Sequence, residues 1–236
     1  MTRRLVLLPG LDGTGALFEP FLRATPRGVR AEPIALPAEP LGYAELAERL
    51  APRVRPDEST VLVAESFSGP LAATLAARHR VAGVVLCNSF VTPPGPERLG
   101  IAVRALGALV APVMFRVAPP RALVRRYLVG PDAPEALVAA VRRAVASVPP
   151  AVLAARLRAV LRADAGAELA RSGAPVMYLR GTDDRVVAES SVRAVIRAAV
   201  GVRVVRVPGP HLLLQARPES AWRAIEGWVA GLSEAW

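Results

Sequence analysis

Short apolar runs alternate with longer amphipathic segments over the first 90 residues of the chain. The runs have the length of buried strands, and the segments between them carry apolar residues at helical spacing. Strands that alternate with helices indicate a parallel sheet that is covered on both faces. We expect strands at residues 4–8, 30–36, 61–64 and 81–87, and helices at residues 16–23, 43–54 and 70–77. Pro33 has no amide hydrogen for a ladder, so the second strand is expected near an edge of the sheet.

The pattern changes after Phe90. A proline-rich break is followed by helical segments, without a convincing strand as far as residue 171. The first of these, residues 101–117, is apolar nearly all round, and such a helix has to be covered or to line an apolar cavity. The sequence therefore predicts an all-helical cap, residues 92–171, with further helices at residues 121–129, 134–148 and 151–162. A plain structural subdomain that does not contact substrate is the alternative.

The alternating pattern returns after the helical segment. Strands are expected at residues 175–179 and 202–207, and helices at residues 189–199 and 218–232. The fold class is therefore α/β, with a doubly wound, mostly parallel sheet of about six strands. Its core consists of residues 1–91 and 172–236, and the helical cap is inserted between these two parts.

A serine follows the most sharply bounded strand of the chain. Ser66 stands between the apolar run 61–64 and the helix 70–77, so the chain has to turn tightly around it. Such a turn exposes a hydroxyl at the end of a strand and close to a helix N-terminus. Ala64 and Ser68, two residues before and two after, are small enough to let the strand and the helix pack closely. A serine in such a loop is more commonly a cap or a turn residue, so Ser66 needs support from elsewhere.

A serine hydroxyl becomes a nucleophile when a base takes its proton and a third group orients the base. The chain has two histidines. His79 stands at the end of the helix after Ser66, where a capping role is expected. His211 instead follows the strand 202–207, at the sheet edge where Ser66 emerges. Asp183 and Asp184 follow the strand 175–179 at that same edge, and either could be the orienting carboxylate.

These stretches together resemble the α/β-hydrolase family, whose nucleophile lies in a G-x-S-x-G elbow and whose triad runs Ser, Asp, His along the chain. Here Ala64 and Ser68 replace both glycines of the elbow. The family pattern of Gly, two residues and Asp fits Gly181 to Asp184. The resemblance thus implies Ser66, His211 and Asp184 as the catalytic residues, with Asp183 as their neighbour.

The resemblance also implies donors for the oxyanion. One is the backbone N–H of Phe67, and the other is that of Leu11, in the loop after the first strand. Many relatives have His-Gly-x in this loop, whereas this chain has Pro9-Gly10-Leu11. This replacement removes a side chain and leaves the backbone donor. The residues expected to contact substrate are Leu11, Asp12, Phe67, Met114 and Leu212.

The implied activity is hydrolysis of a carboxylic ester or thioester with an apolar acyl group through an acyl-enzyme, without a metal or cofactor. The glycine-rich loop after the first strand lacks the Lys-Ser/Thr of a phosphate-binding loop, which disfavours nucleotide binding. An acyltransferase with the same residues remains an alternative, in which an alcohol or thiol replaces water. A non-catalytic binding protein of this fold is less favoured, because the chain keeps both the serine and the histidine.

The charge of the chain raises the question of an anionic partner. The net charge is +10, but all 30 basic residues are arginine, which is typical of a GC-rich coding sequence. They are scattered along helices and not grouped beside aromatic residues, so nucleic acid is not expected as a partner. An acidic acyl carrier protein, steered by a basic rim, is a possible partner. No apolar run reaches the ~18 residues of a membrane span, and the single cysteine, Cys87, agrees with an expected cytoplasmic location.

Overall fold

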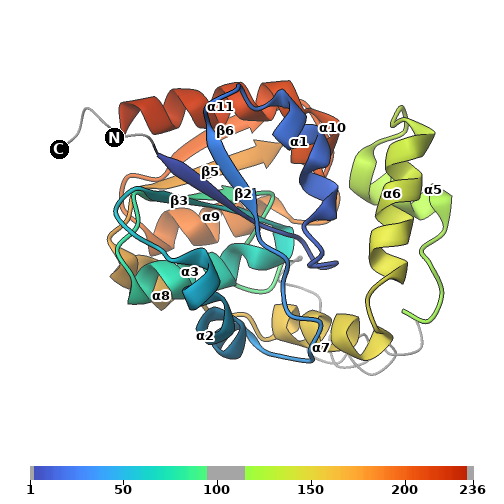
Figure 1. Cartoon of the computed structure of the whole chain (residues 1–236), viewed down its shortest axis with the longest axis horizontal. Coiled ribbons are helices and arrows are strands. Elements are labelled where there is room, and N and C mark those ends of the chain that lie inside the picture. The colour runs from blue at the N-terminus through green and yellow to red at the C-terminus, as the bar shows by residue number, and fades with distance from the viewer. Residues whose placement is uncertain (1–2, 95–114, 233–236) are drawn as a thin grey trace.

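The computed structural model describes residues 3–94 and 115–232 (Figure 1). Six strands form one sheet in the order β2-β1-β3-β4-β5-β6, and every neighbouring pair is parallel. The predicted parallel α/β sheet of about six strands is therefore confirmed. The strands are β1 (Arg4–Leu8), β2 (Arg30–Pro33), β3 (Thr60–Glu65), β4 (Gly83–Cys87), β5 (Val176–Gly181) and β6 (Arg203–Val207).

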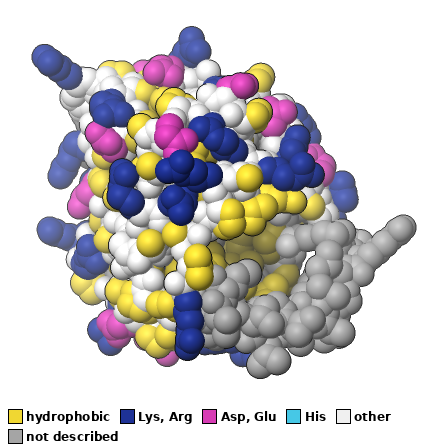
Figure 2. Space-filling view, turned by 90° about the vertical axis from the view of Figure 1, so that its right-hand side faces the viewer, with side chains coloured by type: hydrophobic (Ala, Val, Ile, Leu, Met, Phe, Trp, Pro, Cys, Tyr) yellow, Lys and Arg dark blue, Asp and Glu magenta, His cyan; other side chains and the backbone are white. Residues whose placement is uncertain are grey.

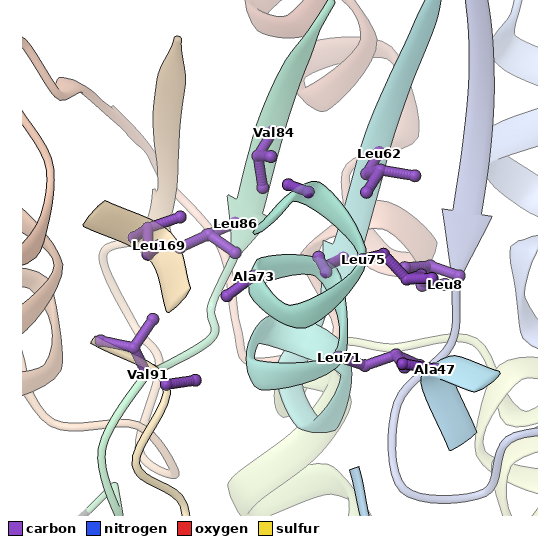
Figure 3. Close-up of a cluster of buried hydrophobic side chains, with 14 of the residues drawn as sticks. Leu8, Ala47, Leu62, Leu71, Ala73, Leu75, Val84, Leu86, Val91 and Leu169 are labelled. Atoms are coloured by element: carbon purple, nitrogen blue, oxygen red, sulfur yellow. The ribbon is translucent and has the colours of Figure 1, made fainter. Parts of the chain in front are cut away.

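Helices cover both faces of the sheet because side chains alternate between the faces along each strand. In β1, Val6 and Leu8 belong to one core cluster, and Leu5 and Leu7 to another. The first cluster includes apolar residues of α2 (Tyr43–Val54), α3 (Gly69–Arg78), α8 (Gly166–Ser172) and α9 (Glu189–Ala198). The second includes residues of α1 (Glu19–Ala24), α10 (Leu213–Ala216) and α11 (Pro218–Gly231). Figure 3 shows side chains of α3 between those of the strands and of neighbouring elements.

The ends of several elements differ from the prediction. β2 lies at an edge of the sheet, as Pro33 indicated, but it ends at that proline instead of continuing to residue 36. Beyond it, Ile34 still donates its N–H to the Leu7 carbonyl. The first helical segment is divided into the 3-10 helix η1 (Ala16–Phe18) and α1. β4 begins two residues later than expected, at Gly83.

The segment predicted as a cap contains α5 (Arg121–Leu123), the π-helix η3 (Val124–Val129), α6 (Glu135–Ala146) and α7 (Pro150–Leu161). Most of the expected helix 101–117 lies outside the described residues. η3 and α6 share an apolar cluster with Leu17 and Leu212 of the sheet domain. α8 packs on α3 and contributes Leu169 to the sheet core. A role of residues 92–171 as a cap stays a prediction.

Among the described residues, no single helix is long and apolar enough to cross a bilayer, although the bent pair α6 and α7 would qualify together by length and composition.

The approach of α3 to the sheet depends on a glycine that the sequence did not single out. Gly69 is the first residue of α3. A Cβ atom added there would lie 2.2 Å from the Ser89 Oγ and 2.4 Å from the Phe90 carbonyl oxygen. Both distances are far below van der Waals contact, and the second neighbour is backbone, which cannot rotate away. Gly69 therefore allows the helix to begin directly after the turn at Ser66.

We expect Gly69→Ala to lower the free energy of unfolding by about 1–3 kcal/mol, because the added methyl overpacks a rigid backbone site. Chemical denaturation monitored by circular dichroism measures this change. Gly227→Ala in α11 is the matched control, because a Cβ there meets no atom within 4 Å. It should raise stability by about 0.5–1 kcal/mol. Equal effects of the two substitutions would contradict the close approach at Gly69.

Candidate active site

Ser66 stands where β3 ends and the 3-10 helix η2 (Ser66–Ser68) begins. Its φ angle is +49°, a left-handed conformation that is unusual for a residue other than glycine. Such strain persists only when the surrounding structure holds it, and it is frequent at functional sites. The turn leaves Ser66 partly accessible, whereas its neighbours Phe67 and Ser68 are buried.

A chain of hydrogen bonds joins three of the residues singled out in the sequence. The His211 Nε2 lies 2.9 Å from the Ser66 Oγ, and the His211 Nδ1 lies 3.0 Å from the Asp184 Oδ1. The three residues follow β3, β5 and β6, so they come from the carboxyl ends of three parallel strands. Asp183, the alternative carboxylate, instead donates its backbone N–H to the Gly209 carbonyl and accepts a hydrogen bond from Thr182. Asp184 is thus the carboxylate that meets His211.

Asp184 is held in its ionised form. Burial by itself raises the pKa of this carboxyl, but the hydrogen bond and charge of His211 lower it, as do the N–H groups of Val186 and Val187. The net pKa lies below the ordinary range of aspartate. Arg180 completes the arrangement by donating to the Asp184 Oδ2 at 2.8 Å. A charged Asp184 is therefore able to orient the imidazole and to stabilise its protonated form.

The loop that carries His211 is fixed by an asparagine that the sequence analysis missed. The Asn88 side-chain amide, fully buried after β4, donates to the carbonyls of Pro210 and His211 at 3.0 and 2.7 Å. Its oxygen accepts the Gly181 N–H at 2.7 Å. A Cβ at Gly181 would lie 2.7 Å from the Pro210 carbonyl, so glycine is required there. Asn88 thus ties the loop after β6 to β5.

The turn at Ser66 is fixed by hydroxyl groups around it. The Ser68 hydroxyl is fully buried and donates to the Pro9 carbonyl, which joins the turn to the loop after β1. The Ser89 hydroxyl donates to the Ser66 carbonyl. The Tyr43 hydroxyl donates to the Phe67 carbonyl at 3.0 Å, and the two aromatic rings lie 4.9 Å apart between centroids. Ser68 therefore has a structural place, and Ser66 is the serine that faces His211.

The glycine-rich loop after β1 is held by a buried arginine of α7. Arg156, 1% exposed, donates to the carbonyls of Leu11 and Asp12 at 3.0 and 2.7 Å and to that of Pro37 at 2.9 Å. Burial lowers the pKa of Arg156, and the charge of Asp12 opposes that shift. A Cβ at Gly13, whose φ is +67°, would lie 2.4 Å from this guanidinium. Arg156 lies on the buried face of its helix. Counting the apolar residues of the sequence does not single out an arginine in such a position.

The residues expected to contact substrate lie in different surroundings. Leu11 is half-buried, and the Asp12 carboxylate accepts hydrogen bonds from the N–H and hydroxyl of Thr14. Leu212 is buried in the cluster formed with η3 and α6. Met114 lies outside the described residues. Phe67 packs on Tyr43, and His79 ends α3, at the far end of that helix from Ser66.

A cavity of about 480 Å³ lies between the sheet domain and the α6 region. Leu17 and Gln215 line it from the sheet domain, and Val129, Leu137 and Ala140 from η3 and α6. Gln215 also contacts Glu65, the residue before Ser66. Hydrophobic side chains gather in a hollow on the face shown in Figure 2. On that face arginine side chains are spread among acidic ones.

Within residues 3–94 and 115–232, no group of three His, Cys, Asp or Glu side chains is arranged to hold a metal ion.

Comparison with known proteins agrees with this architecture. The enol-lactonase from Burkholderia xenovorans LB400 is 19% identical, with a TM-score of 0.74 over 98% of this chain and 92% of that one. The bromoperoxidase from Bacillus anthracis is 17% identical, with a TM-score of 0.79 over 98% and 92%. A thermophilic esterase from Thermogutta terrifontis is 21% identical, with a TM-score of 0.73 over 98% and 90%. At these identities the likeness shows the fold alone.

Sequence comparison goes further than the structural likeness. No curated protein matches the chain significantly. The alpha/beta hydrolase family, however, matches it over residues 5–224, which is nearly its whole length. The matched region includes the turn at Ser66 and the loops of Asp184 and His211. The chain belongs to the alpha/beta hydrolase family and is an enzyme of that family.

Proposed function

We propose that the protein is a serine hydrolase that cleaves a carboxylic ester or thioester with an apolar acyl group. The observation that carries this proposal is the hydrogen-bond chain from Ser66 through His211 to Asp184. A hydroxyl, an imidazole and a buried carboxylate in this order are the parts that nucleophilic acyl transfer needs. Likeness to proteins described as an esterase and an enol-lactonase is compatible with acyl chemistry.

The proposed reaction proceeds in two halves. His211 takes the proton of the Ser66 hydroxyl through Nε2 while the Oγ attacks the substrate carbonyl carbon. The tetrahedral intermediate then collapses, and His211 gives the proton to the departing alcohol or thiol. In the second half His211 deprotonates a water molecule, which attacks the acyl carbon, and as the second tetrahedral intermediate collapses His211 returns the proton to the Ser66 Oγ and the acid is released. Asp184 holds the imidazole and stabilises its charged form in both halves.

The oxyanion is proposed to accept hydrogen bonds from the backbone N–H groups of Phe67 and Leu11. Phe67 is in the first turn of η2, where N–H groups have no partner within the helix. Leu11 lies in the loop that Ser68 and Arg156 fix, through the carbonyls of Pro9 on one side and of Leu11 and Asp12 on the other. Donors held in place before the reaction stabilise the developing charge without reorganisation.

The apolar acyl group is proposed to occupy the cavity between the sheet domain and α6. Leu17, Val129 and Leu137 give it an apolar part that suits an alkyl chain, beside charged side chains such as those of Arg23 and Arg143. Ser66 and His211 do not line this cavity, but Gln215 in its wall donates to Glu65, the residue that precedes Ser66. An acidic acyl carrier protein is a further possible partner on account of the net charge of +10.

The nucleophile is tested by labelling with a fluorophosphonate and mapping the labelled peptide. We expect the label on Ser66 in the wild type and no label in Ser66→Ala, because the reagent forms a bond to an activated serine oxygen. Ser68→Ala is the matched control and should still be labelled at Ser66, since its hydroxyl is engaged with Pro9. Label on another residue, or none in the wild type, would show that the protein is not a serine hydrolase.

The acyl pocket is tested with p-nitrophenyl esters from acetate to octanoate. We expect the wild type to prefer the longer chains. Ala140→Trp, which places a large ring in the cavity wall, should lower the ratio of octanoate to acetate activity by about tenfold or more. Ala146→Trp, at an exposed position of the same helix, should leave this ratio unaffected. A wild type that prefers acetate would contradict the apolar pocket.

The loop of Leu11 is tested through Arg156. We expect Arg156→Met to lower kcat by about 100-fold with a smaller effect on KM, because a displaced donor is lost mainly in the transition state. Arg158→Met is the matched control. Arg158 lies two residues further along α7 and is half-exposed, so this variant should keep the wild-type kcat. Steady-state kinetics on variants shown to be folded measure both constants. Wild-type kcat in Arg156→Met would mean that the loop keeps its geometry without the arginine.

A further inference from the structure

The residue directly before Ser66 is a glutamate that the proposed reaction does not use. Glu65 ends β3 and is only 1% exposed. The Gln215 Nε2 in α10 donates to its Oε2 at 3.1 Å, and Gln215 is 4% exposed. Gln215 follows His211 by four residues, and Glu65 precedes Ser66 by one. The two side chains thus connect the segments that carry the serine and the histidine.

Both side chains keep one oxygen without a partner. Among the described residues, the Glu65 Oε1 and the Gln215 Oε1 are buried and form no hydrogen bond. Within the same residues, Glu65 forms no ion pair. If Glu65 is ionised, the Glu65 Oε1 and the Gln215 Oε1 are both hydrogen-bond acceptors, so they cannot form a hydrogen bond with each other. A proton on Glu65 creates an O–H donor and makes Gln215 Oε1 available as its acceptor, as in the paired hydrogen bonds of a carboxylic acid and an amide.

The surroundings of Glu65 also disfavour a negative charge. A Cβ at Gly10 would lie 3.8 Å from both the Glu65 Oε2 and the Ser66 Cβ, and 3.9 Å from the Asp12 Oδ1. The carboxyls of Glu65 and Asp12 therefore approach one glycine of the proposed oxyanion loop from different elements. Glu65 is paired in register with Cys87 of β4, whose fully buried, neutral thiol supplies no positive charge to a carboxylate. Among the described residues, no arginine or histidine forms an ion pair with Glu65, whereas the charge of Arg156 lies near Asp12.

We propose that Glu65 is a positioning residue that works as a neutral carboxylic acid, paired with Gln215. The pair joins the strand end that carries Ser66 to helix α10 behind His211. It also keeps a second negative charge away from the place where the oxyanion forms. The catalytic part of this inference rests on the proposed function, whereas the protonation of Glu65 does not.

The titration of Glu65 gives the inference its measurable consequence. Burial raises the pKa of this carboxyl to about 8; the hydrogen bond from Gln215 opposes the rise and the charge of Asp12 adds to it. The folded state therefore keeps a proton that the unfolded chain gives up near its ordinary value of 4.5. Stability attributable to Glu65 is complete below 4.5, falls as the pH rises towards 8, and levels off above that.

The first experiment measures protonation directly and needs no enzyme assay. Infrared spectra of the wild type should contain the carbonyl band of a protonated carboxyl at neutral pH, and this band should disappear with a midpoint near pH 8. Glu65→Gln should lack the band. The melting temperature of the wild type should fall relative to that of Glu65→Gln between about pH 5 and about pH 8. Absence of the band in the wild type at neutral pH would overturn the proposal, whether or not any variant folds.

The second experiment tests the positioning role by activity, with the infrared result known. Glu65→Leu leaves Gln215 without its partner. It should lower kcat roughly tenfold, because one positioning contact is lost. Glu65→Gln, which restores two polar groups without a titrating proton, should rescue most of that loss and remove the alkaline limb of the pH profile near pH 8. A folded Glu65→Gln as impaired as Glu65→Leu, or one that keeps the alkaline limb, would overturn the positioning role. Inactivity of the wild type on every ester would count against the proposed function and leave the infrared and melting results to decide protonation.

Discussion

The left-handed turn at Ser66 is the constraint on which the rest of the site depends. A side chain at a φ of +49° is unfavourable by itself, so neighbouring groups have to hold it. Gly69 lets α3 begin against the backbone of Phe90, and Ser89 donates to the Ser66 carbonyl. Ser68, where the family pattern has glycine, adds a hydroxyl that joins the turn to the loop after β1. The replacement of a glycine thus adds a connection between the two loops.

Buried polar side chains carry this order to the other loops. Asn88 fixes the loop of His211, Arg180 fixes Asp184, and Arg156 fixes the loop of Leu11. Each lies at or beside the carboxyl edge of the sheet, where backbone groups leave the ladder and need other partners. A buried polar group without a partner is costly, so each of these contacts has few alternative geometries. These contacts hold the loops that carry His211, Asp184 and Leu11 in defined positions relative to the turn at Ser66.

The sequence predicted the strands because apolar periodicity depends on local residues, and Ser66 and His211 were expected to meet because both follow strands of a parallel sheet. It missed Asn88, Arg156 and Gly69, since each is unremarkable until a segment far along the chain approaches it. The choice of Asp184 over Asp183 came from a resemblance, and the difference between them is visible only in space: Asp183 meets Gly209 and Thr182. Element ends were less predictable because loop contacts, such as Ile34 with Leu7, decide where a strand stops.

Asp184 and Glu65 are both buried carboxyls near the turn, but their partners differ, and their pKa values are shifted in opposite directions. Asp184 has Arg180, His211 and two N–H groups as partners, so it is stable as an anion although buried. Glu65 has an amide and no cation among the described residues that contact it, and burial therefore favours its neutral form. In the proposed reaction, a neutral Glu65 adds no negative charge beside the place where the oxyanion forms.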